Sequence, residues 1–285
     1  MADGAQDAII RRDSGAPVVG FGLKELFKSV ARNRGLVFEL ARREIADVHA
    51  GQMGGVIWAL AHPVLMFMVY AFLFTAVLNV RIGTSGPADY TLYLFAGLAP
   101  WLWTQDIMTR SATVMIANVS IVKKVMFPVE LLIAKTCAAS TFINGILLVL
   151  VIFTMVAVRG TIPISILLLV VLIPLHLMLL AGLALLFSSI TPYFRDFSEI
   201  LRVFLSVTMY LLPVIYLPDM VPRSLRFIVT LNPFSSLIWC YQDVFYFGAI
   251  SHPWAWFGLA MFAGLSLALG TYVFARLKNH LSSVL

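Results

Sequence analysis

Two charged side chains stand four residues apart at the end of an apolar run and are the first candidates for chemistry. Asp106 and Arg110 follow the run 92–104. An i,i+4 spacing places two residues on one face of a helix, where a carboxylate and a guanidinium can pair. A charge inside an apolar, membrane-spanning helix is costly unless it is paired or faces a cavity. The spacing therefore predicts either a buried structural ion pair or a pair that lines or gates a pathway.

Histidine offers a second kind of chemistry, proton transfer, at one position inside an apolar stretch. His176 lies two residues after Pro174 in the stretch 162–190, which contains no other ionisable side chain. A relay needs a second such group, so we predict that His176 is a hydrogen-bonded structural residue, with a proton relay as the alternative. His62, which precedes Pro63, is interpreted with the same caution.

The sequence lacks the motifs that would act on a substrate covalently. It contains no G-x-x-x-x-G-K-[ST], no H-E-x-x-H, no C-x-x-C and no G-x-S-x-G. The two cysteines, Cys137 and Cys240, show no spacing typical of a disulfide framework or a metal site. We therefore predict no catalytic residues and no bound metal, and a protein that forms a passage.

The elements that hold these residues are apolar enough to cross a membrane. Hydrophobic residues make up 61% of the chain and charged residues 12%. A bilayer core of about 30 Å needs roughly 20 mostly apolar helical residues, and only helices and closed barrels satisfy their backbone groups in lipid. The sequence predicts an all-α integral membrane domain at 56–276 with six transmembrane helices. These are 56–78, 91–116, 131–158, 162–190, 200–217 and 254–276.

Charge placement predicts the orientation of these spans. With both termini in the cytoplasm, 16 Lys and Arg residues lie inside and 4 lie outside, as the positive-inside rule requires. The net charge of +6 is then explained without a nucleic-acid partner. Residues 1–20 read as a flexible N-terminus without the apolar core of a signal peptide, and 277–285 as a cytoplasmic C-terminus.

Two segments outside the spans have a distinct pattern. Residues 21–55 mix basic and apolar side chains at helical spacing, which favours an amphipathic helix in the membrane interface over a solvated leader. Residues 218–252 contain several prolines and short apolar runs, which favour short re-entrant helices on the outer face over an exposed loop. We interpret Trp58, Trp101 and Trp103 as anchors in the membrane interface.

The energy source is expected to lie outside this polypeptide. Acidic residues cluster at span ends, and the two halves of the domain show no convincing repeat, unlike many ion-coupled transporters. A separate ATPase would need a docking surface in the cytoplasm. The loop 117–130 is the candidate, because Asn118 can cap a short helix and Pro128 would end it.

Four stretches give the chain a resemblance to the membrane subunits of ABC exporters that move lipid-linked polysaccharides and teichoic acids. Residues 123–130 read K-K-V-M-F-P-V-E and residues 191–199 read T-P-Y-F-R-D-F-S-E. Residues 42–63 contain R-R-E-I, G-Q-M-G-G-V-I-W-A-L and H-P. Residues 213–243 contain P-V-I-Y, V-P, L-N-P-F-S and Y-Q-D. The resemblance covers about 36–276, with every motif in order.

The resemblance implies a homodimer in the bacterial inner membrane, with two separate ATP-binding subunits beneath it. ATP and Mg²⁺ would bind to those partners, so this chain itself would hold no cofactor. Closure of the ATPase pair would move a coupling helix at about 118–127 and, through it, the spans. The implied coupling residues are Asn118, Ile121, Lys123, Lys124, Phe127, Arg195 and Asp196.

The resemblance also implies a substrate path along the dimer seam, between the first and fifth spans of the two copies. Phe67, Tyr70 and Phe74 share one face of the first span, and Tyr210 and Tyr216 belong to the fifth. Aromatic rings stack on the apolar faces of sugars, and tyrosine hydroxyls exchange hydrogen bonds with them. The alternative is that these rings face lipid or pack internally.

Arg42 and Arg43 are the expected contacts for a lipid head group, because guanidinium groups bind phosphate well. Relatives often carry a basic or aromatic pair where this chain has His49 and Ala50. The implied function is export of an undecaprenyl-linked O-antigen-type polysaccharide, with membrane lipids around the protein. The alternatives are a teichoic acid or capsular polysaccharide exporter, an ABC exporter of small hydrophobic compounds, and an ion-driven flippase.

Overall fold

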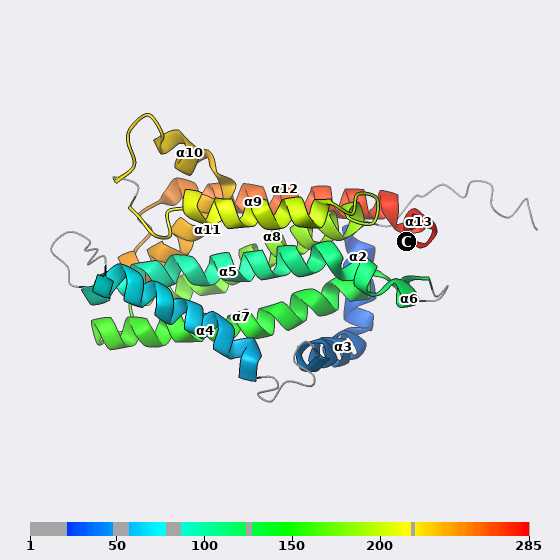
Figure 1. Ribbon diagram of the computed structural model, residues 1–285, viewed down its shortest axis with the longest axis horizontal. Helices are drawn as coiled ribbons and strands as arrows, with labels where there is room; N and C mark the ends of the chain where they lie inside the picture. The colour runs from blue at the N-terminus through cyan, green and yellow to red at the C-terminus, as the bar shows by residue number, and fades with distance from the viewer. Residues whose placement is uncertain (1–21, 48–56, 78–86, 124–126, 218–219, 285) are drawn as a thin grey trace, which may run out of the picture.

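The computed structural model describes residues 22–47, 57–77, 87–123, 127–217 and 220–284, and the regular elements within those ranges are all helical. The long helices lie side by side as a bundle, with α10 standing off at one end and α6 and α13 at the other (Figure 1). The α-helices are α2 (Leu23–Arg32), α3 (Arg34–Asp47), α4 (Ile57–Ala71), α5 (Pro87–Ala117), α6 (Val119–Val122), α7 (Glu130–Arg159), α8 (Leu169–Ile190), α9 (Phe197–Leu211), α10 (Arg226–Leu231), α11 (Pro233–Gln242), α12 (Pro253–Leu277) and α13 (Leu281–Val284). Short π or 3-10 segments are η2 (Phe72–Val77), η3 (Ile164–Leu168), η5 (Asp243–Phe247) and η6 (Lys278–His280).

Three helices within the described ranges are long and apolar enough to cross a membrane. They are α7, the continuous η3–α8 segment at Ile164–Ile190, and α12. Each coincides with a predicted span, so the third, fourth and sixth spans have helices of the expected length. The structure also has helices at the other three predicted positions, α4 with η2, α5, and α9. The count of six spans stays a prediction.

The helix at the fifth predicted span ends earlier than the sequence analysis expected. We predicted a helix to residue 217, but α9 stops at Leu211. Leu212 is extended, with ψ 149°, and the next residue is Pro213. The proline ring clashes with a helical conformation of the residue before it, which ends the helix there. Tyr216 therefore lies in the loop that follows α9.

Two glycines allow α8 and α12 to touch backbone to backbone. A Cβ atom on Gly182 would lie 2.3 Å from the backbone carbon of Ser266, and one on Gly270 would lie 2.1 Å from the carbonyl oxygen of Gly182. Such distances are far inside van der Waals contact. Small residues at a crossing are the usual way for membrane helices to approach closely, because lipid provides no hydrophobic drive for helix association.

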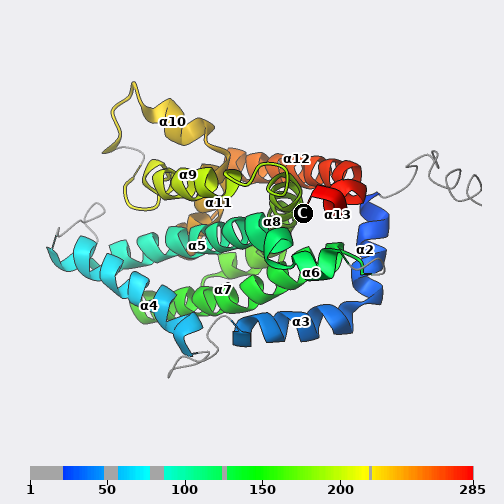
Figure 2. The same cartoon turned by 45° about the vertical axis from the view of Figure 1, so that its right-hand side comes forward.

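The N-terminal amphipathic region forms two helices rather than one. α2 ends at Arg32 and is followed by Asn33, whose backbone N–H and side-chain amide both donate to the carbonyl of Ser29 (side-chain distance 2.8 Å). Asparagine competes for backbone acceptors in this way and so favours helix ends over helix interiors. α2 lies across one end of the bundle and α3 runs beneath α7 (Figure 2). This arrangement is compatible with the predicted interfacial position.

The segment between the fifth and sixth spans contains the two short helices that the sequence predicted, but they differ in burial. α11 is buried along its length and packs on α5 and α12. It begins with Pro233 after Asn232, whose side chain accepts the N–H of Phe234 at 3.0 Å. In α10 Val229 is buried, whereas Leu231 is 76% exposed. Whether these helices enter the membrane stays a prediction.

Two of the three tryptophans expected in the membrane interface are core residues instead. Trp101 and Trp103 are fully buried in α5. Trp101 meets Phe234 edge to face at 5.5 Å, and Trp103 meets His176 at 4.6 Å between ring centroids. The interpretation of these two as anchors was wrong, because α11 and α8 cover this part of α5. Trp58 is exposed, as an anchor requires.

Candidate functional site

The aromatic side chains expected along the substrate path divide into buried and accessible groups. Phe67 is 1% exposed and stacks on Phe95 with ring centroids 4.5 Å apart. Its ring contributes to the core of the protomer, a position that does not fit the expected path role. Tyr70 and Phe74, one and two turns further on, are half-buried with ring centroids 6.3 Å apart.

Tyr70 joins the first and fifth predicted spans. Its hydroxyl donates to Sδ of Met209 on α9 at 3.6 Å. The neighbouring Tyr210 is 65% exposed. Tyr216 is half-buried in the loop after α9, and its carbonyl accepts the hydroxyl of Tyr93 at 3.2 Å. Tyr70 thus lies beside the turn of α9 that carries Tyr210, and the ring of Phe74 lies next to that of Tyr70. We call Tyr70, Phe74 and Tyr210 the aromatic junction.

Around this junction, α4 and α9 present broad apolar surfaces. On α9 the exposed side chains recur at helical spacing, so they form one stripe. Contiguous exposed apolar surface in a protomer marks a face that meets either lipid or another protein. The exposed apolar residues of the two helices and η2 include Leu65, Met68, Val69, Phe72, Ile200, Val203, Phe204, Val207, Tyr210 and Leu211.

The pair Asp106–Arg110 exists and belongs to a larger charge network. Nε of Arg110 donates to Oδ1 of Asp106 at 2.7 Å. Glu44, from α3, lies 3.7 Å from Nη1 of Arg110 and 3.3 Å from Nζ of Lys135 on α7. Two carboxylates and two cations thus neutralise one another. Ser140 also donates to Asp106.

This network connects three helices and satisfies its charges internally. Asn144 donates to Asp106 at 3.3 Å and Thr136 donates to Glu44 at 3.3 Å, both from α7. Partly buried charges of this kind need such partners to offset the loss of hydration. The geometry favours the structural alternative for Asp106 and Arg110, a clamp between α3, α5 and α7.

A second polar cluster ties α2 and η6 to the bundle. Glu130, the first residue of α7, is 4% exposed and accepts from Nζ of Lys278 at 2.8 Å. It also accepts from the hydroxyl of Ser29 on α2 at 2.7 Å. We call Ser29, Glu130 and Lys278 the latch. It holds α2 and the C-terminal segment against the same end of α7.

His176 has the partners expected of a structural histidine. Its Nε2 lies 3.0 Å from the hydroxyl of Thr104 and its Nδ1 lies 3.0 Å from the hydroxyl of Tyr241. The ring is fully buried between α5, α8 and α11. Both ring nitrogens are thus occupied within the protein core.

The coupling loop forms a four-residue helix, α6, at the same end of the bundle as α13 (Figure 1). Asn118 precedes it, but its side-chain amide donates back to the carbonyl of Val114 at 2.8 Å and does not cap α6. Ile121 and Phe127 pack partly against the core, whereas Lys123 is exposed. Lys124 lies outside the described residues.

The loop between α8 and α9 provides a second exposed surface at this end. Arg195 and Asp196 are exposed, as are the neighbouring rings of Tyr193 and Phe194. The Tyr193 hydroxyl donates to the carbonyl of Leu277 at 3.4 Å, which places this loop beside the C-terminal end of α12. Partial burial raises the pKa of the Tyr193 phenol above its ordinary value.

Comparison with known protein families shows which family this chain belongs to. The ABC-2 type transporter membrane family matches residues 35–246, from α3 to η5. The chain belongs to this family. It is therefore a transport component and a multi-pass membrane protein, in agreement with its apolar helices.

Individual relatives of this ABC-2 chain carry a more specific name. An O-antigen export system permease protein RfbA from Klebsiella pneumoniae is 28% identical over 260 residues, which cover 89% of this chain and 97% of the relative. A second Klebsiella pneumoniae protein of that name is 27% identical over the same coverage. One from Myxococcus xanthus is 29% identical over 227 residues, 78% of this chain and 84% of the relative.

The two arginines expected to contact a lipid head group lie on α3 of this ABC-2 subunit. Arg42 and Arg43 are both exposed, and Arg43 pairs with Glu39 at 3.0 Å one turn earlier. Both guanidinium groups are thus at the surface. His49 and Ala50, the departure from the pattern of relatives, lie outside the described residues.

Sequence reasoning missed three charged residues that the fold places in polar clusters. Glu44 stands in the R-R-E-I stretch and Lys135 lies one turn into α7, and both belong to the network. Asp243, the last residue of Y-Q-D, is fully buried and accepts from Nδ1 of His252 at 2.8 Å and from the indole of Trp256 at 3.0 Å. Glu44 and Asp243 stand in family motifs, which was the available signal, whereas Lys135 stands in none of them. The partners of all three lie outside the helical element that holds each residue, where spacing within that element gives no information.

Proposed function

We propose that this chain is the transmembrane subunit of an ATP-driven exporter that moves an undecaprenyl-linked O-antigen-type polysaccharide across the bacterial inner membrane. The observation that carries the proposal is the alignment with O-antigen export permeases over 97% and 84% of their lengths. Within the same proposal, six spans cross the membrane and both termini lie in the cytoplasm. The distribution of Lys and Arg, 16 inside against 4 outside, supports that orientation.

The energy comes from two separate ATP-binding subunits that dock on the cytoplasmic end. The sequence has no P-loop motif of its own, and ABC-2 membrane chains are transport components. The exposed side chains of Lys123, Arg195 and Asp196 support a docking surface made from α6 and the α8–α9 loop. Lys124 completes the proposed surface from outside the described residues.

Movement of α6 would reach the proposed path through α5. Only Asn118 separates the end of α5 at Ala117 from the start of α6 at Val119. A displacement of α6 would therefore be transmitted directly to α5. α5 packs against α9 and η2, which flank the aromatic junction. Docked subunits that close on ATP would thus shift the helices that hold Tyr70, Phe74 and Tyr210.

The path itself is proposed at the seam of a homodimer. The exposed apolar stripes on α4 and α9 support a face that meets a second copy. Tyr70, Phe74, Tyr210 and Tyr216 would line the seam, where rings stack on sugars and hydroxyls exchange hydrogen bonds with them. Arg42 and Arg43 would contact the phosphate of the lipid carrier.

Affinity purification of the tagged chain from its own host, followed by mass spectrometry, tests the partnership. The proposal predicts a P-loop ATPase in equal amount. The double variant Lys123→Glu with Lys124→Glu should lower its recovery, and Arg223→Glu, an exposed arginine that the proposed orientation puts outside, should not. A monodisperse sample without an ATPase would contradict the proposal and favour an ion-driven flippase.

A further inference from the structure

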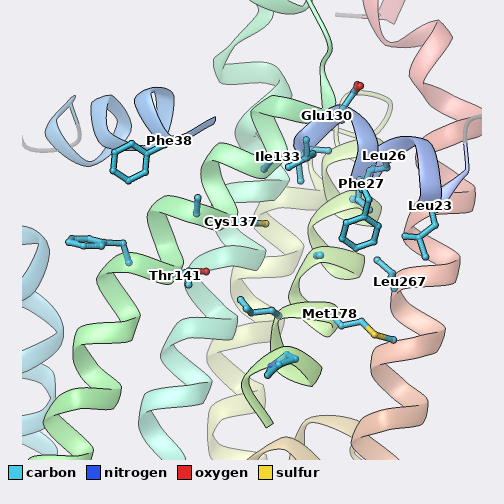
Figure 3. Close-up of a pocket in the computed structure, with 18 residues that line it drawn as sticks. Leu23, Leu26, Phe27, Phe38, Glu130, Ile133, Cys137, Thr141, Met178 and Leu267 are labelled. Atoms are coloured by element: carbon cyan, nitrogen blue, oxygen red, sulfur yellow. The ribbon is translucent and has the colours of Figure 1, made fainter. Parts of the chain in front are cut away.

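The apolar face of α2 lies over a groove instead of packing directly on the bundle. A cavity of about 940 Å³ opens between α2, α7 and α8, and its size is at the upper end of the range for small-molecule sites, about 300–1,000 Å³. No residue of α2 is buried, although Leu23, Leu26, Phe27 and Val30 all point into this space. Figure 3 shows Leu23, Leu26 and Phe27 above the groove, with Cys137 and Met178 on its opposite wall.

The groove is a fixed feature, because α2 is held at both sides of it. Ser29 donates to Glu130 at 2.7 Å, and Glu130 in turn pairs with Lys278. On the following helix, Val37 and Ala41 are buried, and α3 packs on α7. The space beneath α2 therefore stays open between two anchored points.

The lining of the groove is almost entirely apolar, which suits a lipid acyl chain as its occupant. Of its 18 lining residues, Glu130 and Thr141 are the polar ones, and Glu130 already has partners. Water needs two to four polar partners and does not fill an apolar space. The remaining lining consists of aliphatic, aromatic or sulfur-containing side chains of α2, α3, α7, α8 and α12. α7, α8 and α12 are long and apolar enough to cross a membrane.

The depth of the groove fits one leaflet of a bilayer. Its α7 wall runs from Glu130 to Phe142, which at 1.5 Å per residue is about 18 Å along the helix. Half of a bilayer hydrocarbon core is about 15 Å. A lipid whose head group sits at the level of α2 would therefore bury its chains along the whole groove.

The charges on α2 select the kind of head group. Lys24 and Lys28 stand i,i+4 on one side of α2, Lys24 flanking the apolar face and Lys28 further from it, and both are exposed. A lysine side chain is long enough to reach from such positions to a head group at the membrane surface. Neither lysine takes part in an ion pair among the described residues. Lys24 is the charged residue nearest to the apolar face, and Lys28, Arg32 and Glu25 lie further round the helix. With three basic residues and one acidic residue, the polar side of α2 carries a net positive charge. Basic residues next to a membrane attract anionic lipids.

We propose that the groove beneath α2 binds an anionic diacyl phospholipid of the cytoplasmic leaflet, with its acyl chains along α7 and α8 and its phosphate at Lys24 and Lys28. The lipid completes the packing of α2 on the bundle. This site lies apart from the seam of α4 and α9 and does not depend on the exported polymer.

Photo-crosslinking with a phosphatidylglycerol that carries a diazirine in its acyl chain tests the proposal on the full-length chain in membranes. Crosslinks should concentrate on peptides covering 133–142 and 174–185. Unlabelled phosphatidylglycerol should compete better than phosphatidylcholine. Labelling that is equally strong at exposed positions outside the groove, such as Phe153 and Val170, would mean ordinary boundary lipid and would overturn the proposal. So would competition by a polyprenyl phosphate but not by phosphatidylglycerol.

Two matched pairs of variants test the groove and its rim separately. Ala138→Trp fills the groove and should abolish the local labelling, whereas Ala157→Trp, at an exposed position on the same helix, should not. Lys24→Gln with Lys28→Gln should lower the preference for phosphatidylglycerol by up to roughly thirtyfold, since each basic residue near the surface contributes about 1 kcal/mol. The double arginine variant should keep that preference. Unchanged preference in the glutamine variant would contradict the assignment of the head group.

Discussion

At the scale of single residues, the polar side chains of this protein divide into clusters that hold helices together and groups that remain accessible. Glu44, Asp106, Arg110 and Lys135 neutralise one another, and His176 is fully occupied by Thr104 and Tyr241. Each of these groups has a partner on a neighbouring helix of the bundle, which favours a structural role for it. Tyr70, in contrast, is half-buried and contacts Met209, the residue next to the exposed Tyr210.

The ion pair between Glu44 and Lys135 should stabilise the packing of α3 on α7. Their side chains are 16% and 12% exposed, so solvent screens the pair only in part. A double-mutant cycle with Glu44→Gln and Lys135→Gln should give a coupling energy of about 1 kcal/mol. The measurement is the thermal unfolding of each variant in detergent. Additive effects of the two substitutions would show that the pair does not contribute.

The rings of Tyr70 and Phe74 should matter for export and not for ATP turnover. Tyr70→Ala with Phe74→Ala removes two stacking surfaces, and we expect polymer export to fall on the order of tenfold. Tyr70→Phe keeps the ring and should retain more activity. Phe153→Ala is the matched control, because Phe153 is an exposed aromatic residue on α7, away from the proposed path. Normal export by the double variant would remove these rings from the path.

At the scale of elements, the sequence predicted the positions of the helices well. It predicted less well where each helix ends and which neighbouring helices bury its side chains. Apolar runs located α7, α8 and α12, because hydropathy is a property of the segment itself. The break between α2 and α3 depends on Asn33, and the end of α9 depends on Pro213. In each case one residue ends the helix, and the prediction rested on the pattern of the whole segment instead. The burial of Trp101 and Trp103 depends on α8 and α11, which no local pattern could place.

The same reasoning explains what was missed in the candidate site. The i,i+4 spacing was enough to pair Asp106 with Arg110, since both lie on one helix. Glu44 and Lys135 reach that pair from α3 and α7, at sequence separations that spacing rules do not cover. Phe67 shares a helix face with Tyr70, but the position of Phe95 on α5 decides that its ring is buried.

The crossing of α8 and α12 at two glycines gives a sharp test of the bundle. A Cβ on Gly182 would meet the backbone of α12 at 2.3 Å, so Gly182→Ala must push the helices apart. We expect a loss of stability of about 1–3 kcal/mol, the usual range for overpacking. Gly145→Ala on α7, where nothing lies within 4 Å, should be neutral or stabilising. Equal melting temperatures of the two variants in detergent would contradict the close approach.

The position of α10 can be tested with a single cysteine in a background without Cys137 and Cys240. Ser236 on α11 is only 6% exposed, so protein alone shields it and labelling there says nothing about membrane entry. Leu231→Cys is informative, because Leu231 is 76% exposed in the protomer. If α10 re-enters the membrane, a membrane-impermeant thiol reagent should react slowly there. Rapid labelling in intact cells would make the segment an exposed loop.

At the scale of the whole molecule, the two ends of the bundle and the face between them have different parts in the proposed mechanism. One end exposes Lys123, which follows α6, and the α8–α9 loop, where we propose that a partner docks. The latch ties α2 and the C-terminal segment to the same end. α5 runs from that end along the bundle to the aromatic junction. In the proposed mechanism, the chain would link a docking surface to an apolar seam, and its sequence has no ATP-binding motif of its own.

The central claim is that ATP, used by a separate subunit, drives lipid-linked polysaccharide through this chain. The most direct measurement is uptake of undecaprenyl-linked polymer into inverted inner-membrane vesicles that contain the chain and its co-purifying ATPase. We predict uptake that requires ATP, stops when the P-loop lysine of the ATPase is replaced, and survives collapse of the proton gradient. Uptake that persists with the inactive ATPase but stops with the proton gradient would contradict the account.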